Sequence, residues 1–293
     1  MKKLLAIILA LSMLFCFAAC GGRDSDDKSD KSDDEDKYIK FEEDDEDTEN
    51  DDDDDSKKTI VVGYTIFEPM NYKDANGDFV GFDTELAKAV FEKLGYKVVF
   101  KEIEWDQKFV NLNSGNIDCI WNGLTPEAVD EDGTPRTEKA DFSYNYMDNT
   151  QVVVVRSDSG IATYDDLYGK VAVAEYASVG ESYATYVYEA NCTAVNDKAS
   201  CLIEVRCGAA DFAVVDYEFA KKTVGFGDYS DLKVVSSLTS APEHYAVAFK
   251  KGSSLTAKVN KQLEALAADG TIAALAKKYG LEYAVITDFA DQK

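Results

Sequence analysis

The fold is decided by the stretch Thr59-Ile60-Val61-Val62-Gly63-Tyr64, a short β-branched run that is typical of a strand. Phe82–Leu94 then has apolar residues at helical spacing, and Lys97–Ile103 is again strand-like. A strand, a helix and a strand in this order form a βαβ unit, which predicts a parallel sheet. Asn76-Gly77 stands between apolar flanks, so Lys73–Asp78 is predicted to be a tight hairpin turn rather than a calcium loop.

The rest of the chain continues the alternation of strands and helices in two blocks. The first block is completed by a helix over Trp105–Leu112 and by the strands Asp118–Trp121 and Gln151–Arg156. The second contains the strand Lys170–Ala174, the helix Gly180–Ala190, a strand near Thr193, the helix Lys198–Cys207, the strands Phe212–Val215 and Tyr245–Phe249, and the final helices Leu255–Asp269 and Thr271–Tyr279. Two such blocks indicate either two lobes with two chain crossings or two tandem α/β domains.

The N-terminus combines two lysines with a short apolar run. Lys2 and Lys3 precede Leu4–Ala19, which ends at Cys20 after small residues, so residues 1–19 are interpreted as a secretory signal peptide. The run has 16 residues, fewer than the roughly 20 that a membrane-spanning helix needs. Its end resembles the bacterial lipobox, with Phe17 in place of the usual Leu, which implies lipidation at Cys20. Without lipidation the product would be freely secreted.

The segment after Cys20 is strongly acidic. Gly21–Lys58 contains 20 Asp or Glu against 7 Lys or Arg, which places about half of the net charge of −25 there. Almost no apolar residues are present, so this segment cannot bury enough surface to offset its ordering entropy. Residues 20–58 are therefore predicted to be a disordered tether.

The cysteines leave the redox state open. Four of the six follow the tether, and four thiols in an exported protein allow three complete pairings. Cys119 lies in an apolar strand and is predicted to be buried. A bridge from Cys192 to Cys201 or to Cys207 is left open by the sequence.

Several short motifs follow one another from residue 81 to residue 146. They are Gly81–Ala87, Trp105-Asp106, Asn113–Asp118, Trp121–Thr125, and Arg136 with Asp141–Tyr144. In this order they resemble the polar amino-acid family of solute-binding proteins (family 3), the ligand-capturing subunits of ABC importers. The likeness runs from about Thr59 to the C-terminus.

The resemblance implies an α/β, two-lobed periplasmic-binding-protein-like fold of type II. Lobe 1 would comprise 59–151 and 246–293, and lobe 2 would comprise 152–245, with crossings at Gln151–Arg156 and His244–Phe249. It also implies a monomer that binds a free amino acid and presents it to a membrane permease, with no cofactor, no metal and no nucleic-acid partner. The protein would act outside the cytoplasmic membrane, anchored through Cys20.

A free amino acid requires a fixed acid and a fixed base in a dehydrated cleft. The resemblance implies that Arg136 binds the ligand carboxylate, with further bonds from the backbone near Asn122 and Gly123 and from the Thr125 hydroxyl. The loop Pro126–Pro135 is longer than is usual in the family, so Arg136 could instead lie on the surface.

The acid implied by the resemblance is Asp216, at the end of a predicted strand, where open α/β sheets bind ligands. It would take the ligand ammonium; the alternative is a helix N-cap. With the cleft open, neither Asp216 nor Arg136 is expected to be paired in a core. Ser178 follows a strand and either contacts the ligand carboxylate or caps a helix, where Glu175 departs from the usual Gln.

Aromatic residues are expected to form the walls of the cleft. Phe67 and Trp105 occupy positions from which a ring can stack on a ligand side chain, whereas Trp121 is either wall or core. An enzyme similar to cyclohexadienyl dehydratases is the alternative function, and it would need a poised acid such as Glu68 or Glu175. The single histidine, His244, completes no Ser-His-Asp set that the sequence shows.

Overall fold

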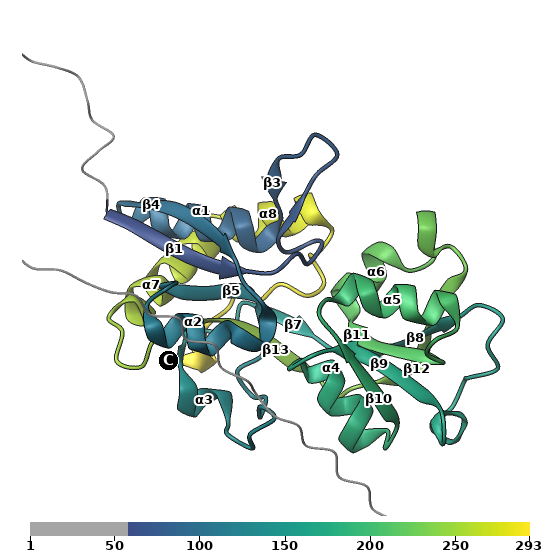
Figure 1. Cartoon of the computed structure of the whole chain (residues 1–293). Coiled ribbons are helices and arrows are strands. Elements are labelled where there is room, and N and C mark those ends of the chain that lie inside the picture. Colours follow the sequence, from purple (N-terminus) through teal and green to yellow (C-terminus); the bar gives the residue numbers. More distant parts are fainter. Residues whose placement is uncertain (1–57) are drawn as a thin grey trace, which may run out of the picture. The chain divides into compact units, whose positions relative to one another are not determined.

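The computed structural model describes residues 58–293. The predicted signal peptide, Cys20 and almost all of the predicted tether lie outside the described residues. The described chain forms two main β-sheets, each flanked by helices, and a small hairpin (Figure 1). Among the described residues, no helix is long and apolar enough to cross a membrane.

The first sheet has the order β4-β1-β5-β13-β6, with β7 paired to β13. Strand β1 runs parallel to both β4 and β5, as the predicted βαβ unit requires, whereas β13 is antiparallel to β5. The strands are β1 Lys58–Tyr64, β4 Tyr96–Glu102, β5 Cys119–Leu124, β6 Asp141–Phe142, β7 Met147–Asn149 and β13 Glu243–Phe249.

Helices cover both faces of this sheet because its central strands are buried on both sides. Cys119 and Trp121 of β5 belong to a core cluster with α1, α7 and α8, while Ile120 and Leu124 belong to a cluster with α2. This alternation follows from the two-residue period of a strand. The helices are α1 Phe82–Lys93, the 3₁₀ turn Trp105–Gln107 with α2 Lys108–Ser114, α3 Arg136–Lys139, α7 Leu255–Ala268 and α8 Thr271–Tyr279.

The predicted hairpin turn is confirmed. β2 (Tyr72–Lys73) pairs antiparallel with β3 (Phe79–Val80). In the turn, Oδ1 of Asp74 accepts hydrogen bonds from the backbone N–H groups of Asn76 and Asp78 at 2.9 and 3.0 Å. The carboxylate of Asp74 thus orders the backbone of the turn.

The second sheet has the order β10-β9-β11-β8-β12. β9 runs parallel to β10 and β11, and β8 is antiparallel to both β11 and β12. The edge strand β12 was not predicted from the sequence. The elements are β8 Gln151–Arg156, β9 Val171–Glu175, α4 Val179–Ser182 with a π-helical turn Tyr183–Val187, β10 Asn191–Val195, α5 Lys198–Cys207, β11 Phe212–Asp216, α6 Tyr217–Thr223 and β12 Leu232–Thr239.

Of the two segments predicted to link the sheets, Gln151–Arg156 is wrong, whereas His244–Phe249 overlaps a link that the structure has. Gln151–Arg156 does not cross between them, because it is a strand inside the second sheet. The link is made instead by β7 and the start of β13, where Asn149 pairs with Glu243 and Met147 with Tyr245 (Figure 1). The lobe boundaries 59–151, 152–245 and 246–293 stay a prediction.

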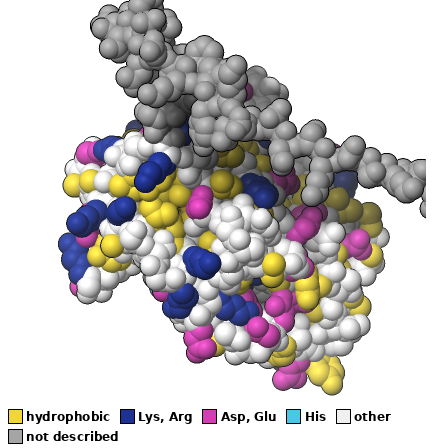
Figure 2. Space-filling model, turned by 60° about the vertical axis from the view of Figure 1, so that its left-hand side comes forward, with side chains coloured by type: hydrophobic (Ala, Val, Ile, Leu, Met, Phe, Trp, Pro, Cys, Tyr) yellow, Lys and Arg dark blue, Asp and Glu magenta, His cyan; other side chains and the backbone are white. Residues whose placement is uncertain are grey.

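The cysteines after residue 58 are free thiols. Cys119 is buried, as predicted, and Cys201 is buried in the core under α5. Cys192 is partly exposed and forms no bridge to either Cys201 or Cys207. Basic, acidic and apolar side chains are interspersed on the face of the molecule in Figure 2.

Candidate functional site

Asp216 ends strand β11 and is almost completely buried. Its Oδ1 atom accepts hydrogen bonds from Asn149 Nδ2 at 2.9 Å, Gln151 Nε2 at 3.0 Å and the Tyr245 hydroxyl at 2.8 Å. Although Asp216 stands at the N-cap position of α6, its side chain makes no capping bond. The carboxylate therefore lies in a polar cluster between the two sheets instead of capping the helix.

Lys198 is the buried cation of this cluster. It is the first residue of α5, and its Nζ atom contacts Oε2 of Glu175 and lies 3.5 Å from Oδ2 of Asp216. Burial alone would lower the pKa of Lys198, but the charges of Glu175 and Asp216 outweigh it and hold the pKa above its ordinary value. Lys198 was not predicted as a site residue.

Phe67 and Trp105 face the same ammonium group. The Lys198 Nζ atom lies 4.7 Å from the ring centroid of Phe67 and 5.6 Å from that of Trp105. Both rings come from the part of the chain around the first sheet, whereas Lys198 and Glu175 come from the second. The ammonium group of Lys198 therefore contacts both of the predicted aromatic wall residues and the carboxylate of Asp216.

Arg136 is buried, so the long loop before it does not carry it to the surface. Its Nε atom donates to Asp130 Oδ1 at 2.8 Å, and its Nη1 atom donates to the carbonyl oxygen of Thr125 at 3.2 Å. The Nη2 atom donates to the carbonyl oxygen of Ala177, which follows β9 of the second sheet, at 3.2 Å. Arg136 thus bridges the two parts of the molecule.

Asp130, in the loop Pro126–Pro135, is the buried partner of Arg136. Its second oxygen accepts from Lys139 Nζ at 2.8 Å, so one carboxylate is shared by two cations. Burial raises the pKa of Asp130, but Arg136 and Lys139 outweigh it and bring the pKa below its ordinary value. The expectation that Arg136 and Asp216 are unpaired is therefore wrong, since both lie buried among charged or polar partners.

Lys108 lies between these two clusters. Its Nζ atom donates to the carbonyl oxygens of Trp105 at 3.3 Å and Ala177 at 3.2 Å, and it lies 4.9 Å from the ring centroid of Trp105. Burial lowers its pKa to about 7. A continuous series of contacts therefore runs from Asp216 through Lys198, Trp105 and Lys108 to Ala177, and from Ala177 to Arg136.

Asn122 and Gly123 have structural roles. The Asn122 side chain bonds Thr65 N, O and Oγ1 and Asn71 Oδ1, at distances of 2.7 to 3.0 Å. The Gly123 N–H donates to Oδ2 of buried Asp83 at 2.9 Å. These groups are therefore committed within the protein. The hydroxyl of buried Thr125 lies beside the Arg136 contact and stays a predicted ligand group.

Ser178 caps α4, since its Oγ atom accepts from Glu181 N at 3.1 Å. Trp121 belongs to the core, where its ring lies 5.8 Å from that of Phe91 and 6.1 Å from that of Tyr146. Neither observation places these two side chains at the Asp216 cluster.

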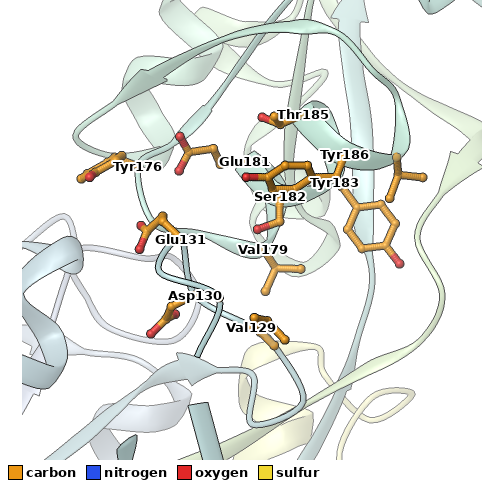
Figure 3. Close-up of a pocket in the computed structure, with 13 residues that line it drawn as sticks. Val129, Asp130, Glu131, Tyr176, Val179, Glu181, Ser182, Tyr183, Thr185 and Tyr186 are labelled. Atoms are coloured by element: carbon orange, nitrogen blue, oxygen red, sulfur yellow. The ribbon is translucent and has the colours of Figure 1, made fainter. Parts of the chain in front are cut away.

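A cavity of about 720 Å³ lies between the loop 128–133, whose Asp130 lines it, and the segment 176–187 (Figure 3). Its lining includes Glu131, Tyr176 and Tyr183 but none of the residues Phe67, Trp105, Lys198 and Asp216. The described residues contain no group of three or more His, Cys, Asp or Glu side chains suited to hold a metal ion.

Two sheets linked by β7 and β13, with opposite charges gathered between them, are the architecture of two-lobed binding proteins. The chain belongs to the bacterial extracellular solute-binding proteins, family 3, whose sequence model matches residues 60–282. The resemblance inferred from the sequence motifs is confirmed by this match.

Individual similar proteins agree with the family. The arginine-binding extracellular protein ArtP of Bacillus subtilis is 27% identical over 95% of this chain and 98% of its own length. The L-cystine-binding protein TcyA of the same organism is 28% identical over 95% and 97%. A solved ancestral arginine-binding protein bound to glutamine is 33% identical, with a TM-score of 0.69 over 76% of this chain and 98% of that one. The predicted fold class is confirmed.

Proposed function

We propose that the protein is the extracytoplasmic subunit of an ABC importer that captures a polar amino acid by hinge closure. The observation that supports this most directly is the separation of charge between the sheets. Asp216 lies at one end of the series of contacts and Arg136 at the other, and a zwitterion needs one acid and one base of this kind. The names of the similar proteins, which include arginine and cystine binders, support an amino-acid ligand.

In this proposal Asp216 binds the ligand ammonium and Arg136 the carboxylate. The planar guanidinium can offer two parallel donors to a carboxylate. The Thr125 hydroxyl completes the carboxylate site, and Phe67 and Trp105 enclose the side chain.

Closure is proposed to occur about β7 and β13. Ligand contacts to both sheets would stabilise a closed state that is otherwise rarely populated. The closed monomer would then be presented to a membrane permease. We also propose that lipidation of Cys20 anchors the protein at the outer face of the cytoplasmic membrane, with the acidic segment as its tether.

The alternative enzyme is less well supported. Glu175, one of the two acids considered for proton donation, is paired with Lys198. Although burial raises the pKa of Glu175, that paired lysine opposes the shift. A carboxylate held in an ion pair is a poor proton donor, so we propose a receptor without catalytic activity.

Titration calorimetry against the twenty amino acids, cystine and ornithine tests the proposal. One-to-one binding of at least one of them, with no turnover of prephenate or arogenate, is the expected result. Turnover of either acid would favour the enzyme, and the absence of binding for every compound would contradict the receptor.

A further inference from the structure

Lys198 occupies a position suited to a cationic ligand side chain. Its side chain is 7% exposed, and its ammonium lies between the carboxylates of Glu175 and Asp216 and the rings of Phe67 and Trp105. Aromatic faces and buried carboxylates are the groups that recognise an alkylammonium or guanidinium ion in proteins. The chain therefore fills its own cation site with one of its own residues.

The charges around Lys198 leave room for one further positive charge only. Two carboxylates, Glu175 and Asp216, face the ammonium of Lys198. A third buried carboxylate, Glu243, shares the amide donors of Asn149 and Gln151 with Asp216, and the ammonium of Lys108 beside Trp105 offsets its charge. One net negative charge therefore remains for the α-ammonium of a ligand. A ligand with a cationic side chain would bring a second positive charge, close to Lys198 in a site that excludes water. Like charges placed together in such surroundings disfavour binding.

Lys198 also retains hydrogen-bonding capacity for a ligand. An ammonium group has three donors, and Glu175 and Asp216 take one each at most. The third donor suits an amide or carboxylate oxygen. The Nζ atom of nearby Lys108 lies 4.9 Å from the ring centroid of Trp105 and donates to the carbonyl oxygens of Trp105 and Ala177, so one of its three donors is left as well.

We propose that Lys198 determines the side-chain specificity of the site, so that the protein selects amino acids with neutral polar or acidic side chains and rejects arginine and lysine. This inference rests on the proposed function, because it assumes that the cleft binds a free amino acid. The position of Lys198 at the start of α5 is a second indication that this residue has a specific role. A lysine is disfavoured at a helix N-terminus, where the macrodipole is positive.

The test is titration calorimetry of the purified protein and of three variants with L-glutamine, L-glutamate, L-cystine, L-arginine and L-lysine. For the unmodified protein, arginine and lysine are expected to bind at least 30-fold more weakly than the best neutral or acidic ligand. In Lys198→Met, Glu175 becomes available to a cationic side chain, so arginine should bind at least tenfold more tightly than to the unmodified protein.

Two variants serve as controls. Glu175→Gln/Lys198→Met removes both charges and should lack the gain for arginine, because no carboxylate remains for the side chain. Lys221→Met removes an exposed lysine whose Nζ atom lies over Tyr283, away from Phe67 and Trp105, and it should leave every affinity within twofold. Melting curves verify that each variant is folded.

Failure of this inference can be distinguished from failure of the proposed function. If the unmodified protein binds arginine or lysine as tightly as any neutral amino acid, the specificity role is wrong although the receptor function stands. An unchanged arginine affinity in folded Lys198→Met also overturns it. If no amino acid binds at all, the receptor function itself fails. If Lys198→Met does not fold, the relative affinities of the unmodified protein for cationic and for neutral or acidic amino acids test the inference.

Discussion

Tyr245 of β13 donates its hydroxyl hydrogen to Oδ1 of Asp216 at the end of β11, with 2.8 Å between the oxygen atoms. The bond joins the two sheets, since β13 belongs to the first and β11 to the second. Asn149 and Gln151 donate to the same oxygen, whereas Oδ2 faces Lys198. We infer that Oδ1 stabilises the segment that links the two sheets and that Oδ2 is the oxygen that binds the ligand ammonium.

Replacement of Asp216 by asparagine should abolish tight binding with little loss of stability. An asparagine oxygen can still accept the bonds from Tyr245 and its neighbours, and Lys198 keeps Glu175 as its partner. The ligand ammonium loses its counter-charge, which typically costs about 2–5 kcal/mol, or roughly 30- to 5000-fold in affinity. Calorimetry of Asp216→Asn measures this loss, and Tyr245→Phe, which keeps the charge, is its control.

Asp216→Ala is a poorer test than the sequence alone indicates. The alanine would leave the Tyr245 hydroxyl without its acceptor, whereas Asn149 and Gln151 still donate to Oε1 of Glu243 at 2.5 and 2.7 Å. A buried donor without an acceptor costs about 1–3 kcal/mol. Near-normal affinity in Asp216→Asn, by contrast, would contradict the assigned ammonium site directly.

The sequence predicts best the features that have a local cause. The helix Phe82–Leu94 and its flanking strands follow from side-chain periodicity, and Asp216 follows from its place at a strand end. The strand β12 (Leu232–Thr239) was missed, and it is an edge strand whose buried residues are interrupted by exposed ones.

The side chains that pair with one another within the site were not predicted, because no local sequence pattern specifies these pairs. Lys198 and Glu175 are 23 positions apart, and only the packing of α5 on β9 brings them together. The pairing of Arg136 with Asp130 depends on how the loop folds back. One local signal for Lys198 was available, since Asp197 caps α5 and places the lysine in the unfavourable first turn.

Gly123→Ala should destabilise the fold beside the site. Gly123 has a φ of 58°, and a Cβ atom there would lie 2.7 Å from Cε1 of Phe67 and 3.1 Å from Cε2 of Tyr245. Strain together with overpacking costs about 2–4 kcal/mol. Gly77→Ala is the matched control, because its φ of 87° is also positive but no atom lies within 4 Å of the added Cβ. Equal melting temperatures for the two variants would show that the close approach does not matter.

The predicted tether should be dispensable for binding, because its composition provides no apolar surface to pack. A shortened protein that begins at Lys57 is expected to bind the ligand with the affinity of the full mature chain. Calorimetry of the two forms at the same ionic strength makes the comparison, and a tenfold loss of affinity would assign the acidic segment a part in the site.

Cys20→Ser should prevent acylation and release the protein from the membrane fraction. The expectation rests on Ala18-Ala19-Cys20 at the end of the apolar run. Mass spectrometry of the native N-terminus is the measurement. An unmodified Cys20, or cleavage at another position, would show that the lipoprotein interpretation is wrong and that the protein is secreted freely.

Arg136→Ala should weaken binding and stability together, in contrast to Asp216→Asn. The ligand carboxylate loses its partner, which costs about 2–5 kcal/mol, and Asp130 keeps only Lys139. Breaking a buried pair typically costs 3–5 kcal/mol; because Lys139 remains, we expect about 2–3 kcal/mol, or roughly 4–12 °C in melting temperature. In Asp130→Ala/Arg136→Ala the orphaned carboxylate is gone, so the melting temperature should partly recover while binding stays lost. If affinity returns with the melting temperature, Arg136 holds the loop and does not bind the ligand.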